Sequence, residues 1–269
     1  MILRDVTSIA RALPPQTVSI DVSLDAIDRL ARIKADLLSN GRVRVAALAA
    51  ELGVSEMTVR RDLDSLADRG VAHRVRGGAL AVGPEHFADR FGRHSRAKDR
   101  IAAKLLTLIT DGDSIGLDAS TTVQRLASRL DAVRSLTAVT NSIESHAVLA
   151  AQPGVTALLT GGNLDIRTGS LVGPMATRAA RDFVLGTLFL SAAGIDPING
   201  TTEATLEEAE VKRALAEVSD LVVVAVDSSK FGQRGPARCL PLARIDVLVT
   251  DLDPADAALD PYRKRCKLL

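Results

Sequence analysis

The sequence predicts an α/β protein with a winged helix-turn-helix domain at residues 24–80 and a Rossmann-like, mostly parallel α/β domain at residues 98–252. Two observations predict this fold class. Three segments with helical apolar periodicity and a short β-like hairpin occupy the first part. Aliphatic runs alternate with helical patterns in the second part, as in a parallel sheet covered on both faces. Residues 1–23 are expected to form a mobile extension, residues 81–97 a linker and residues 253–269 a C-terminal tail.

The first predicted helix spans residues 24–40 and is followed by Gly41, which is typical of a helix end. Its apolar positions recur at helical spacing: Ile27, Leu30, Ile33, Leu37 and Leu38. A second short helix at residues 45–52 is closed by Gly53, and a third begins just after it. Two short helices joined by a tight glycine-containing turn form a helix-turn-helix. Any small three-helix bundle would show the same periodicity, so this pattern alone leaves both interpretations open.

The third helix, residues 54–66 with the sequence VSEMTVRRDLDSL, has the features of a DNA recognition helix. Ser55 can cap its first turn. Its apolar face is formed by Val59, Leu63 and Leu66. The residues left for DNA in the first turns are Ser55, Thr58, Arg60 and Arg61. A helix with a buried aliphatic side and an N-terminal end rich in hydroxyl and guanidinium groups suits a DNA major groove.

Residues 71–80 alternate as a short β-hairpin that ends in Gly77 and Gly78. The alternation predicts that Arg74 and Arg76 project from one face of this wing. Two arginines beside a recognition helix would contact DNA phosphates or the adjacent minor groove. The expected macromolecular partner is therefore double-stranded DNA.

Composition excludes several other classes of protein. Aromatic residues make up 2% of the 269 residues and Trp is absent, so stacking platforms for single-stranded nucleic acid are not expected. The net charge is +1, and residues 1–97 hold 15 basic against 12 acidic residues, a net of +3. Two cysteines and four unclustered histidines predict neither a disulfide framework nor a metal site, and no cofactor is expected. The first 22 residues resemble neither a signal peptide nor a membrane anchor, which favours a cytoplasmic protein without a membrane partner.

The second domain is predicted to open with a helix at residues 98–108. Six aliphatic strands are expected at residues 114–117, 136–140, 155–160, 187–192, 221–226 and 247–250. The helices expected between them span residues 123–130, 143–150, 175–183 and 206–217. In such a sheet, ligands bind just beyond the carboxyl ends of the strands.

Polar residues and glycines follow the predicted strands at those ends. The first group, residues 118–122, precedes a helix, so its hydroxyls, backbone N–H groups and the helix dipole suit an anion such as phosphate. An ordinary helix cap with spare hydroxyls would look the same, and a single lysine is often only a solvated charge. The candidate effector-binding residues are Asp118, Ser120, Thr121, Thr122, Asn141, Gly161, Gly162, Gly194, Lys212, Asp227 and Lys230.

The chain resembles the DeoR-type bacterial transcriptional repressors. In the first domain the resemblance lies in residues 54–63, in Leu66 and Gly70, and in the Arg-Gly-Gly-Ala run at 76–79. Two positions differ from the family pattern, which usually has His at Arg76 and commonly Ile at Val59. In the second domain the matching segments are residues 118–122, 140–142, 161–162, 171–174, 208–212, 227–231 and 245–251. The family commonly has Gly where this chain has Ser120, which leaves open a tighter phosphate loop.

The resemblance covers residues 26–252 and implies an effector-sensing second domain, similar in fold to sugar-phosphate isomerases, that binds a phosphorylated sugar or a related metabolite. The protein is therefore expected to be a transcriptional repressor of sugar metabolism whose operator affinity depends on that effector. Because such helices read paired half-sites, a homodimer or homotetramer is expected. The alternative is a sugar-phosphate isomerase or hydrolase with an accessory DNA-binding domain, in which Asp118, Glu208 or Asp227 would be the general base. No nucleophile and base pair with motif spacing supports that alternative.

Overall fold

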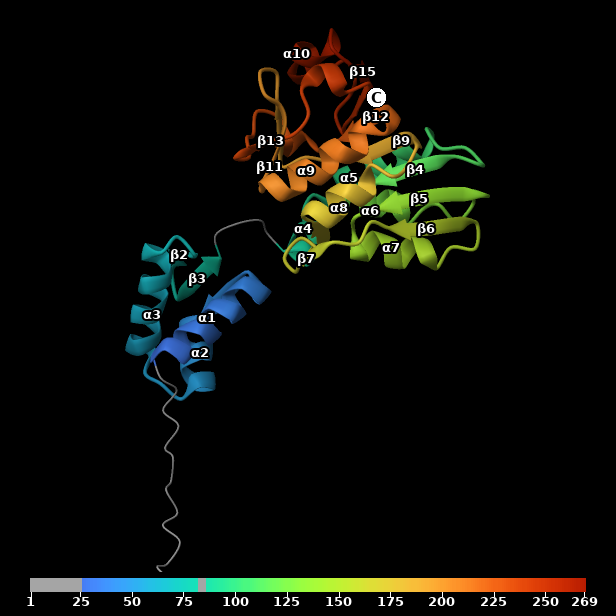
Figure 1. Ribbon diagram of the computed structural model, residues 1–269. Helices are drawn as coiled ribbons and strands as arrows, with labels where there is room; N and C mark the ends of the chain where they lie inside the picture. The colour runs from blue at the N-terminus through green and yellow to red at the C-terminus, as the bar shows by residue number, and fades with distance from the viewer. Residues whose placement is uncertain (1–25, 82–85) are drawn as a thin grey trace, which may run out of the picture.

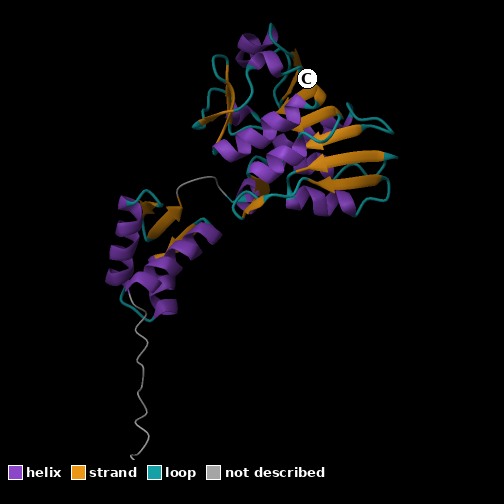
Figure 2. Ribbon diagram, viewed as in Figure 1, coloured by secondary structure: helices purple, strands orange, loops and turns teal. Residues whose placement is uncertain are grey.

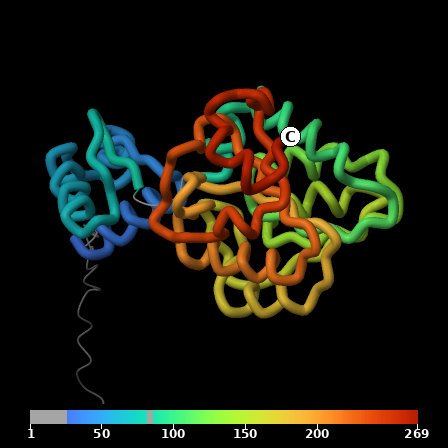
Figure 3. Tube along the Cα trace, turned by 90° about the horizontal axis from the view of Figure 1, so that it is seen from above, coloured from blue at the N-terminus to red at the C-terminus, as the bar shows by residue number. Residues whose placement is uncertain are grey.

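A computed structural model describes residues 26–81 and 86–269 of the protein (Figure 1). The predicted extension at residues 1–23 lies outside the described residues. The first described part contains helices α1 (Ala26–Asn40), α2 (Val45–Leu52) and α3 (Glu56–Asp68), with strands β1 (Arg42–Arg44), β2 (Ala72–Val75) and β3 (Gly78–Ala81). This is a winged helix-turn-helix, as predicted. Figure 3 shows it in blue and cyan as a body separate from the larger α/β part.

The core of the winged domain is aliphatic. Its fully buried side chains come from the apolar stripes of all three helices and include Ile33, Leu37, Val45, Leu48, Val59, Leu63 and Leu66. The wing has one strand more than the sequence predicted, because β1 pairs antiparallel with β3 in the order β1-β3-β2. A Cβ on Gly78 would lie 2.0 Å from the carbonyl oxygen of Val43, so only glycine permits this close strand approach. Three residues carry too little periodicity to predict β1.

The segment expected as a linker is largely ordered helix. Strand β3 includes Ala81, and after the undescribed residues 82–85 come α4 (Phe87–Gly92) and α5 (Ser95–Leu106). Helix α4 is fixed to the α/β domain because the Phe87 amide donates to the carbonyl of Arg167 at 2.7 Å. The Arg125 guanidinium also lies 4.4 Å from the centroid of the Phe91 ring.

The α/β domain contains one parallel sheet with the strand order β15-β14-β12-β9-β4-β5-β6. Its strands are β4 (Ser114–Leu117), β5 (Leu136–Thr140), β6 (Val155–Leu159), β9 (Leu185–Leu190), β12 (Ser219–Ala225), β14 (Val247–Val249) and β15 (Lys267–Leu268). The helices between them are α6 (Thr121–Ala127), α7 (Ile143–Ala150), α8 (Pro174–Ala180) and α9 (Leu206–Glu217).

Helices cover both faces of the sheet, and each face has its own aliphatic core (Figure 2). Helices α8 and α9 pack on one face with residues such as Ala176 and Leu215, while α5, α6 and α7 pack on the other with residues such as Ile101 and Leu126. Neighbouring strand residues alternate between the two cores, as the pleat requires. The predicted Rossmann-like, mostly parallel α/β fold class is therefore confirmed.

Residues 253–269 are part of this domain, although the sequence suggested a tail. They form a 3-10 helix at Ala257–Leu259, helix α10 (Asp260–Arg263) and strand β15 at the edge of the sheet. Tyr262 is 2% exposed, packs against the Phe231 ring at 5.3 Å between centroids, and donates its hydroxyl hydrogen to the carbonyl of Ile195. A two-residue strand and one aromatic anchor give almost no periodic signal in the sequence.

Two small antiparallel sheets accompany the main one. They consist of β7 (Asn163–Asp165) with β8 (Ser170–Val172), and of β10 (Gly194–Asp196), β11 (Gly200–Glu203) and β13 (Ala237–Arg238). The sequence predicted neither, because each strand is only two to four residues long. Within the described residues, no helix combines the length and apolar character needed to span a membrane.

Candidate functional site

A cavity of about 330 Å³ lies beyond the carboxyl ends of β4, β9 and β12, where a parallel sheet normally binds its ligands. Its lining comes from the α4–α5 region, the first turn of α6, Thr168, the residues after β9, the segment from β11 to α9, and the residues after β12. The side chains at its wall that can carry charge are Arg90, Arg93, His94, Lys98, Glu203, Glu208, Lys212, Asp227 and Lys230. Cationic groups, carboxylates and hydroxyls therefore line one partly open cavity.

The structure brings together six of the effector-binding candidates at the cavity wall: Ser120, Thr121, Thr122, Lys212, Asp227 and Lys230. Asp118 is fully buried and contacts this wall through Ser120, whose hydroxyl lies 2.5 Å from the Asp118 carboxylate. The remaining candidates, Asn141, Gly161, Gly162 and Gly194, do not line the cavity.

Those four residues have structural roles instead. The Asn141 side-chain amide donates to the carbonyl of Leu171, and the backbone carbonyl of Asn141 accepts from the Leu171 amide at 2.7 Å. Gly162, with φ +124°, and its neighbour Gly161, with φ +70°, lie in the left-handed region between β6 and β7. A Cβ on Gly194 would lie 2.1 Å from a backbone oxygen of the loop before β13. Close backbone packing selects glycine at Gly162 and Gly194, and a positive φ favours it at Gly161, so these loops contain the residue type that a ligand loop also uses.

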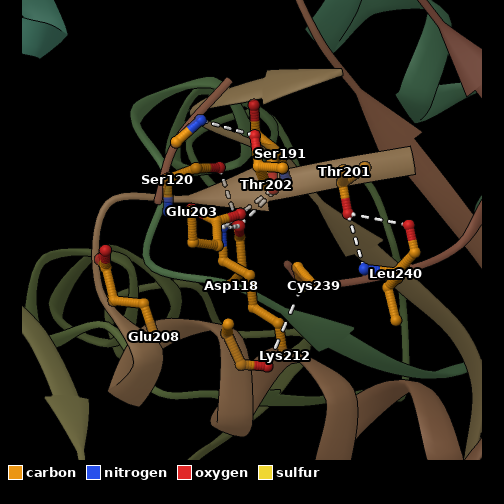
Figure 4. Close-up of polar contacts among 12 residues, drawn as sticks. Asp118, Ser120, Ser191, Thr201, Thr202, Glu203, Glu208, Lys212, Cys239 and Leu240 are labelled. Carbon is orange, nitrogen blue, oxygen red and sulfur yellow. Dashed lines mark hydrogen bonds and ion pairs between the residues drawn. The ribbon is translucent and has the colours of Figure 1, made fainter. Parts of the chain in front are cut away.

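A buried ion-pair network supports the floor of the cavity (Figure 4). The Lys212 ammonium lies 2.9 Å from a carboxylate oxygen of Asp118 and 2.7 Å from one of Glu203. It also donates to the carbonyl of Ser191, whose amide donates to Asp118. All three ionisable side chains are at least 92% buried, so this lysine is a fixed part of the wall rather than a solvated surface charge.

Burial and charge act in opposite directions on this network. Burial raises the pKa of Glu203 to about 7, although the nearby Lys212 ammonium opposes the shift. Burial also disfavours the charged form of Lys212, but the carboxylates of Asp118, Glu203 and Glu208 outweigh it and hold the pKa of Lys212 above its usual value. Lys212 is therefore a permanent cation at neutral pH.

The Ser120 hydroxyl is committed to the protein. It lies 2.5 Å from Asp118 and accepts a hydrogen bond from the Val123 amide at 3.2 Å, which makes it the cap of α6. The sequence left open whether residues 118–122 form a simple helix cap or an anion loop. The Ser120 side chain is the cap, whereas the amides of Thr121 and Thr122 begin the helix and have no intrahelical acceptor.

Lys98 is a cavity residue that the sequence did not suggest. It is 5% exposed, and its ammonium donates to the carbonyl of Arg90 at 2.5 Å and to the Thr121 hydroxyl at 2.9 Å. Burial, opposed in part by Asp227, lowers its pKa to about 8. One cation thus joins α4, α5 and α6 beside the first hydroxyl of the α6 turn.

Helix α4 and the start of α5 are held against the cavity by several contacts. The Arg125 guanidinium donates to the carbonyl of Phe91, to the Ser95 hydroxyl and to the Asp99 carboxylate. Before α4, the His86 ring contacts the carbonyl of Leu38 in the last turn of α1 at 3.1 Å. A carbonyl only accepts, so Nε2 of His86 is the donor. The chain between the two domains therefore touches both the cavity wall and the winged domain.

The N-terminal end of α3 is exposed and polar, as predicted. The Ser55 hydroxyl accepts from the Thr58 amide at 3.1 Å and also contacts the Thr58 hydroxyl at 2.9 Å. The Arg60 guanidinium pairs with Glu56 one turn earlier at 2.7 Å. Arg61 is exposed and makes no hydrogen bond or ion pair with the residues that the structure describes. Of Arg60 and Arg61, it is therefore Arg61 whose guanidinium can contact DNA without first leaving a partner among the described residues.

The two wing arginines lie in different local structures, Arg74 in strand β2 and Arg76 in the turn that follows it. Arg74 donates to the Asp64 carboxylate on α3 at 2.7 Å and to the Gly78 carbonyl at 2.6 Å, so it fastens the hairpin to the recognition helix. Arg76 lies in the turn between β2 and β3, beyond the last strand residue, and is exposed. The strand alternation used for the prediction ends at Val75, which explains why it does not reach Arg76.

Two family models match the chain. The DeoR-like helix-turn-helix domain matches residues 29–85, and the DeoR C terminal sensor domain matches residues 93–252. The chain belongs to the DeoR family. The second match begins at Arg93, just after α4, and covers α5 and every cavity-lining residue except Arg90, so the matched sensor domain begins before the first strand of the sheet.

Relatives of this DeoR-family chain align along most of its length. The HTH-type transcriptional repressor GlcR of Bacillus subtilis (strain 168) is 32% identical over 237 residues, which cover 87% of this chain and 91% of that protein. The glycerol-3-phosphate regulon repressor of Escherichia coli (strain K12) is 31% identical over 219 residues, covering 80% of this chain and 86% of that protein. The chain is thus a DNA-binding transcriptional regulator and not an enzyme.

Likeness to solved structures is partial. Ribose 5 phosphate isomerase A from Neisseria gonorrhoeae is 20% identical with a TM-score of 0.35 and covers 51% of this chain and 54% of that chain. The tetrameric eIF2B-beta2-delta2 complex from C. thermophilum gives a TM-score of 0.44 at 15% identity, covering 89% of this chain and 72% of that chain. We draw no functional conclusion from likeness at this level.

Several cavity residues of this regulator were missed by sequence reasoning, notably Arg90, Arg93, His94, Lys98 and Glu203. One signal was available. Lys98 precedes Ile101, Ala102 and Leu105 by three, four and seven residues, so a lysine occupies the buried stripe of its own helix. A charge at such a position needs a partner or a ligand. No comparable signal marks Glu203, because only the small antiparallel sheet places β11 beside the cavity.

Proposed function

We propose that this regulator is a repressor of a sugar or carbohydrate operon whose operator affinity changes when a phosphorylated sugar, or a related phosphorylated metabolite, occupies the cavity. The observation that carries the proposal is the cavity itself, which brings cations, hydroxyls and the first amides of α6 together in one space. A phosphate group would be bound there by the Thr121 and Thr122 amides and by Lys98 and Lys230.

The position of α4 supports the link between effector and DNA. Arg90 and Arg93 line the cavity from the segment that also contains His86, which contacts α1 of the winged domain. An effector that prefers one arrangement of this segment would change the equilibrium between DNA-compatible and DNA-incompatible forms. By linkage, operator DNA would change effector affinity by the same factor.

The exposed end of α3 would enter the major groove, with the wing beside it. Ser55, Thr58, Arg60 and Arg61 are the proposed contacts of the helix, and Arg76 is the proposed contact of the wing. Contact by Arg74 would require its guanidinium to be shared with Asp64. Because recognition helices normally read paired half-sites, the protein is expected to bind as a homodimer or homotetramer.

The DNA part is tested by fluorescence anisotropy on the DNA upstream of the protein's own gene. Arg61→Ala is expected to weaken binding by about 1 to 3 kcal/mol and to relax specificity if Arg61 reads a base. Arg60→Ala is expected to cost less, because this side chain already pairs with Glu56. Arg69→Ala, at the far end of α3, is the matched control. Unchanged affinity in both test variants would contradict the recognition-helix assignment.

The effector part is tested by calorimetry and thermal shift with inorganic phosphate and a panel of sugar phosphates on the full chain. Binding of at least one phosphorylated compound, weakened in Lys98→Met and Lys230→Ala, is the expected result. Lys264→Ala, an exposed lysine after α10, is the control. If no phosphorylated compound binds, the cavity is not a phosphate site and the proposed effector class is wrong.

A further inference from the structure

The Glu208 side chain lies largely buried in the cavity wall. The residue is 8% exposed and lines the cavity, and its side chain makes no hydrogen bond or ion pair with the residues that the structure describes. Only its backbone amide is engaged, with the Thr205 hydroxyl. Figure 4 shows Glu208 on α9 beside the Asp118 and Lys212 network, with no dashed line reaching it.

The neighbouring acids differ from Glu208 in this respect. Asp118 accepts from the Ser191 amide at 2.9 Å and pairs with Lys212. Glu203 pairs with Lys212 at 2.7 Å, and Asp227 accepts from the amide and hydroxyl of Ser229. Among the four carboxyl groups of Asp118, Glu203, Glu208 and Asp227, that of Glu208 is therefore the one for which no partner is found among the described residues.

A carboxyl group that lines a cavity without a protein partner can accept a hydrogen bond from a bound ligand. Burial raises the pKa of Glu208, while the positive charges of Lys212 and Arg90 oppose that shift. A ligand that brings a hydrogen-bond donor to this carboxylate gains a charge-assisted bond. A ligand that brings a second carboxylate meets a like charge in a poorly solvated space.

Resting on the proposed phosphate-binding function, we propose that Glu208 is a specificity-determining residue that accepts a hydrogen bond from a hydroxyl group of the effector. The phosphate group occupies the α6 turn near Lys98, and Glu208 reads a hydroxyl elsewhere on the same molecule. The site thereby selects phosphorylated alcohols and sugars over phosphorylated carboxylic acids of the same size.

The test uses ligand pairs that differ in one group. sn-Glycerol 3-phosphate is compared with 3-phosphoglycerate, and glucose 6-phosphate with 6-phosphogluconate, by calorimetry on the full-length protein. Inorganic phosphate reports on the anion subsite alone. The proteins are the wild type, Glu208→Gln and Glu210→Gln. The last is the matched control because Glu210 lies on the same helix, is exposed and does not line the cavity.

For the wild type, we expect the alcohol of at least one pair to bind roughly tenfold or more tightly than the acid. Glu208→Gln is expected to reduce that ratio by roughly tenfold, because the glutamine amide accepts more weakly from a hydroxyl and can donate to a carboxylate. Inorganic phosphate affinity should change less than the ratio, and Glu210→Gln should leave the ratio unchanged. Thermal unfolding confirms that each variant is folded.

Two contrary results have different meanings. If phosphate and the ligand pairs bind, but the acids bind as tightly as the alcohols or the ratio is the same in Glu208→Gln, the role of Glu208 is wrong and the phosphate site stands. If neither inorganic phosphate nor any phosphorylated compound binds the wild type, the phosphate site and the role of Glu208 are both wrong.

Discussion

Single buried charges define the chemistry of this sensor domain. Lys98 and Lys212 both lie on apolar stripes of helices, yet their environments differ. Lys212 has two carboxylates within 2.9 Å and stays charged, whereas Lys98 is surrounded by a carbonyl and a hydroxyl and has a pKa lowered to about 8. Lys98 is therefore a cavity cation whose charge changes within an experimentally accessible pH range.

Effector affinity should depend on this titration. Below pH 8 Lys98 is protonated and attracts phosphate, and as pH rises through about 8 it loses its charge, so affinity should fall. Between pH 7.5 and 9 the phosphate monoester is already a dianion, because its second pKa is about 6. Calorimetry with a bound sugar phosphate should show a dissociation constant that rises by up to about tenfold across this window.

The matched variants are Lys98→Met, which should flatten this pH dependence, and Lys104→Met, which should retain it. Lys104 lies on the same helix but donates to the carbonyl of Thr250, away from the cavity. An equally steep pH dependence in Lys98→Met would show that another group titrates.

Short elements complete the α/β domain. The long aliphatic strands and amphipathic helices were predicted from periodicity alone, because each buries a regular stripe. Strands β1, β7, β8, β10, β11, β13 and β15 are two to four residues long and were not predicted. Their pairing depends on partners distant in the sequence, such as Lys267 beside Val247. The C-terminal segment joins the fold through these contacts.

Tyr262 tests the contribution of that segment. Tyr262→Ala should lower the free energy of unfolding of the α/β domain by about 3 to 5 kcal/mol, because it leaves a cavity against Phe231. Tyr262→Phe removes only the hydroxyl bond to Ile195 and should cost about 1 kcal/mol. Urea denaturation followed by circular dichroism measures both. A Tyr262→Ala variant as stable as the wild type would mean that residues 253–269 behave as a tail.

At the scale of the whole molecule, the sensor cavity and the winged domain share one segment. Residues 86–98 line the cavity with Arg90, Arg93, His94 and Lys98, and begin with the His86 contact to α1. A Cβ on Gly41, just after α1, would lie 2.6 Å from the His86 ring, so the two fit closely. We propose this contact as the route by which effector binding would reach the winged domain.

His86→Ala should therefore weaken the coupling without weakening either binding event by itself. We expect the effector dissociation constant to stay within about twofold, while the effector-induced change in operator affinity shrinks several-fold from a typical coupling of about 1 to 3 kcal/mol. Anisotropy titrations with operator DNA, with and without effector, measure this change. His146→Ala on α7 is the control. Full coupling in His86→Ala would exclude the contact as a route.

The sequence by itself determined the two-domain α/β architecture, the family, the helix-turn-helix and six of the nineteen residues that line the cavity. These features follow from local periodicity and from residues that follow strands directly, as at Thr121 and Asp227. Only the tertiary structure decided that Asn141 and the glycines at 161, 162 and 194 lie outside the cavity wall. It also decided that Arg74 binds Asp64, and that Lys98, Glu203 and Glu208 line the same cavity. The physical reason is that these contacts join segments between 10 and 110 residues apart, and no local pattern records which segments the sheet brings together.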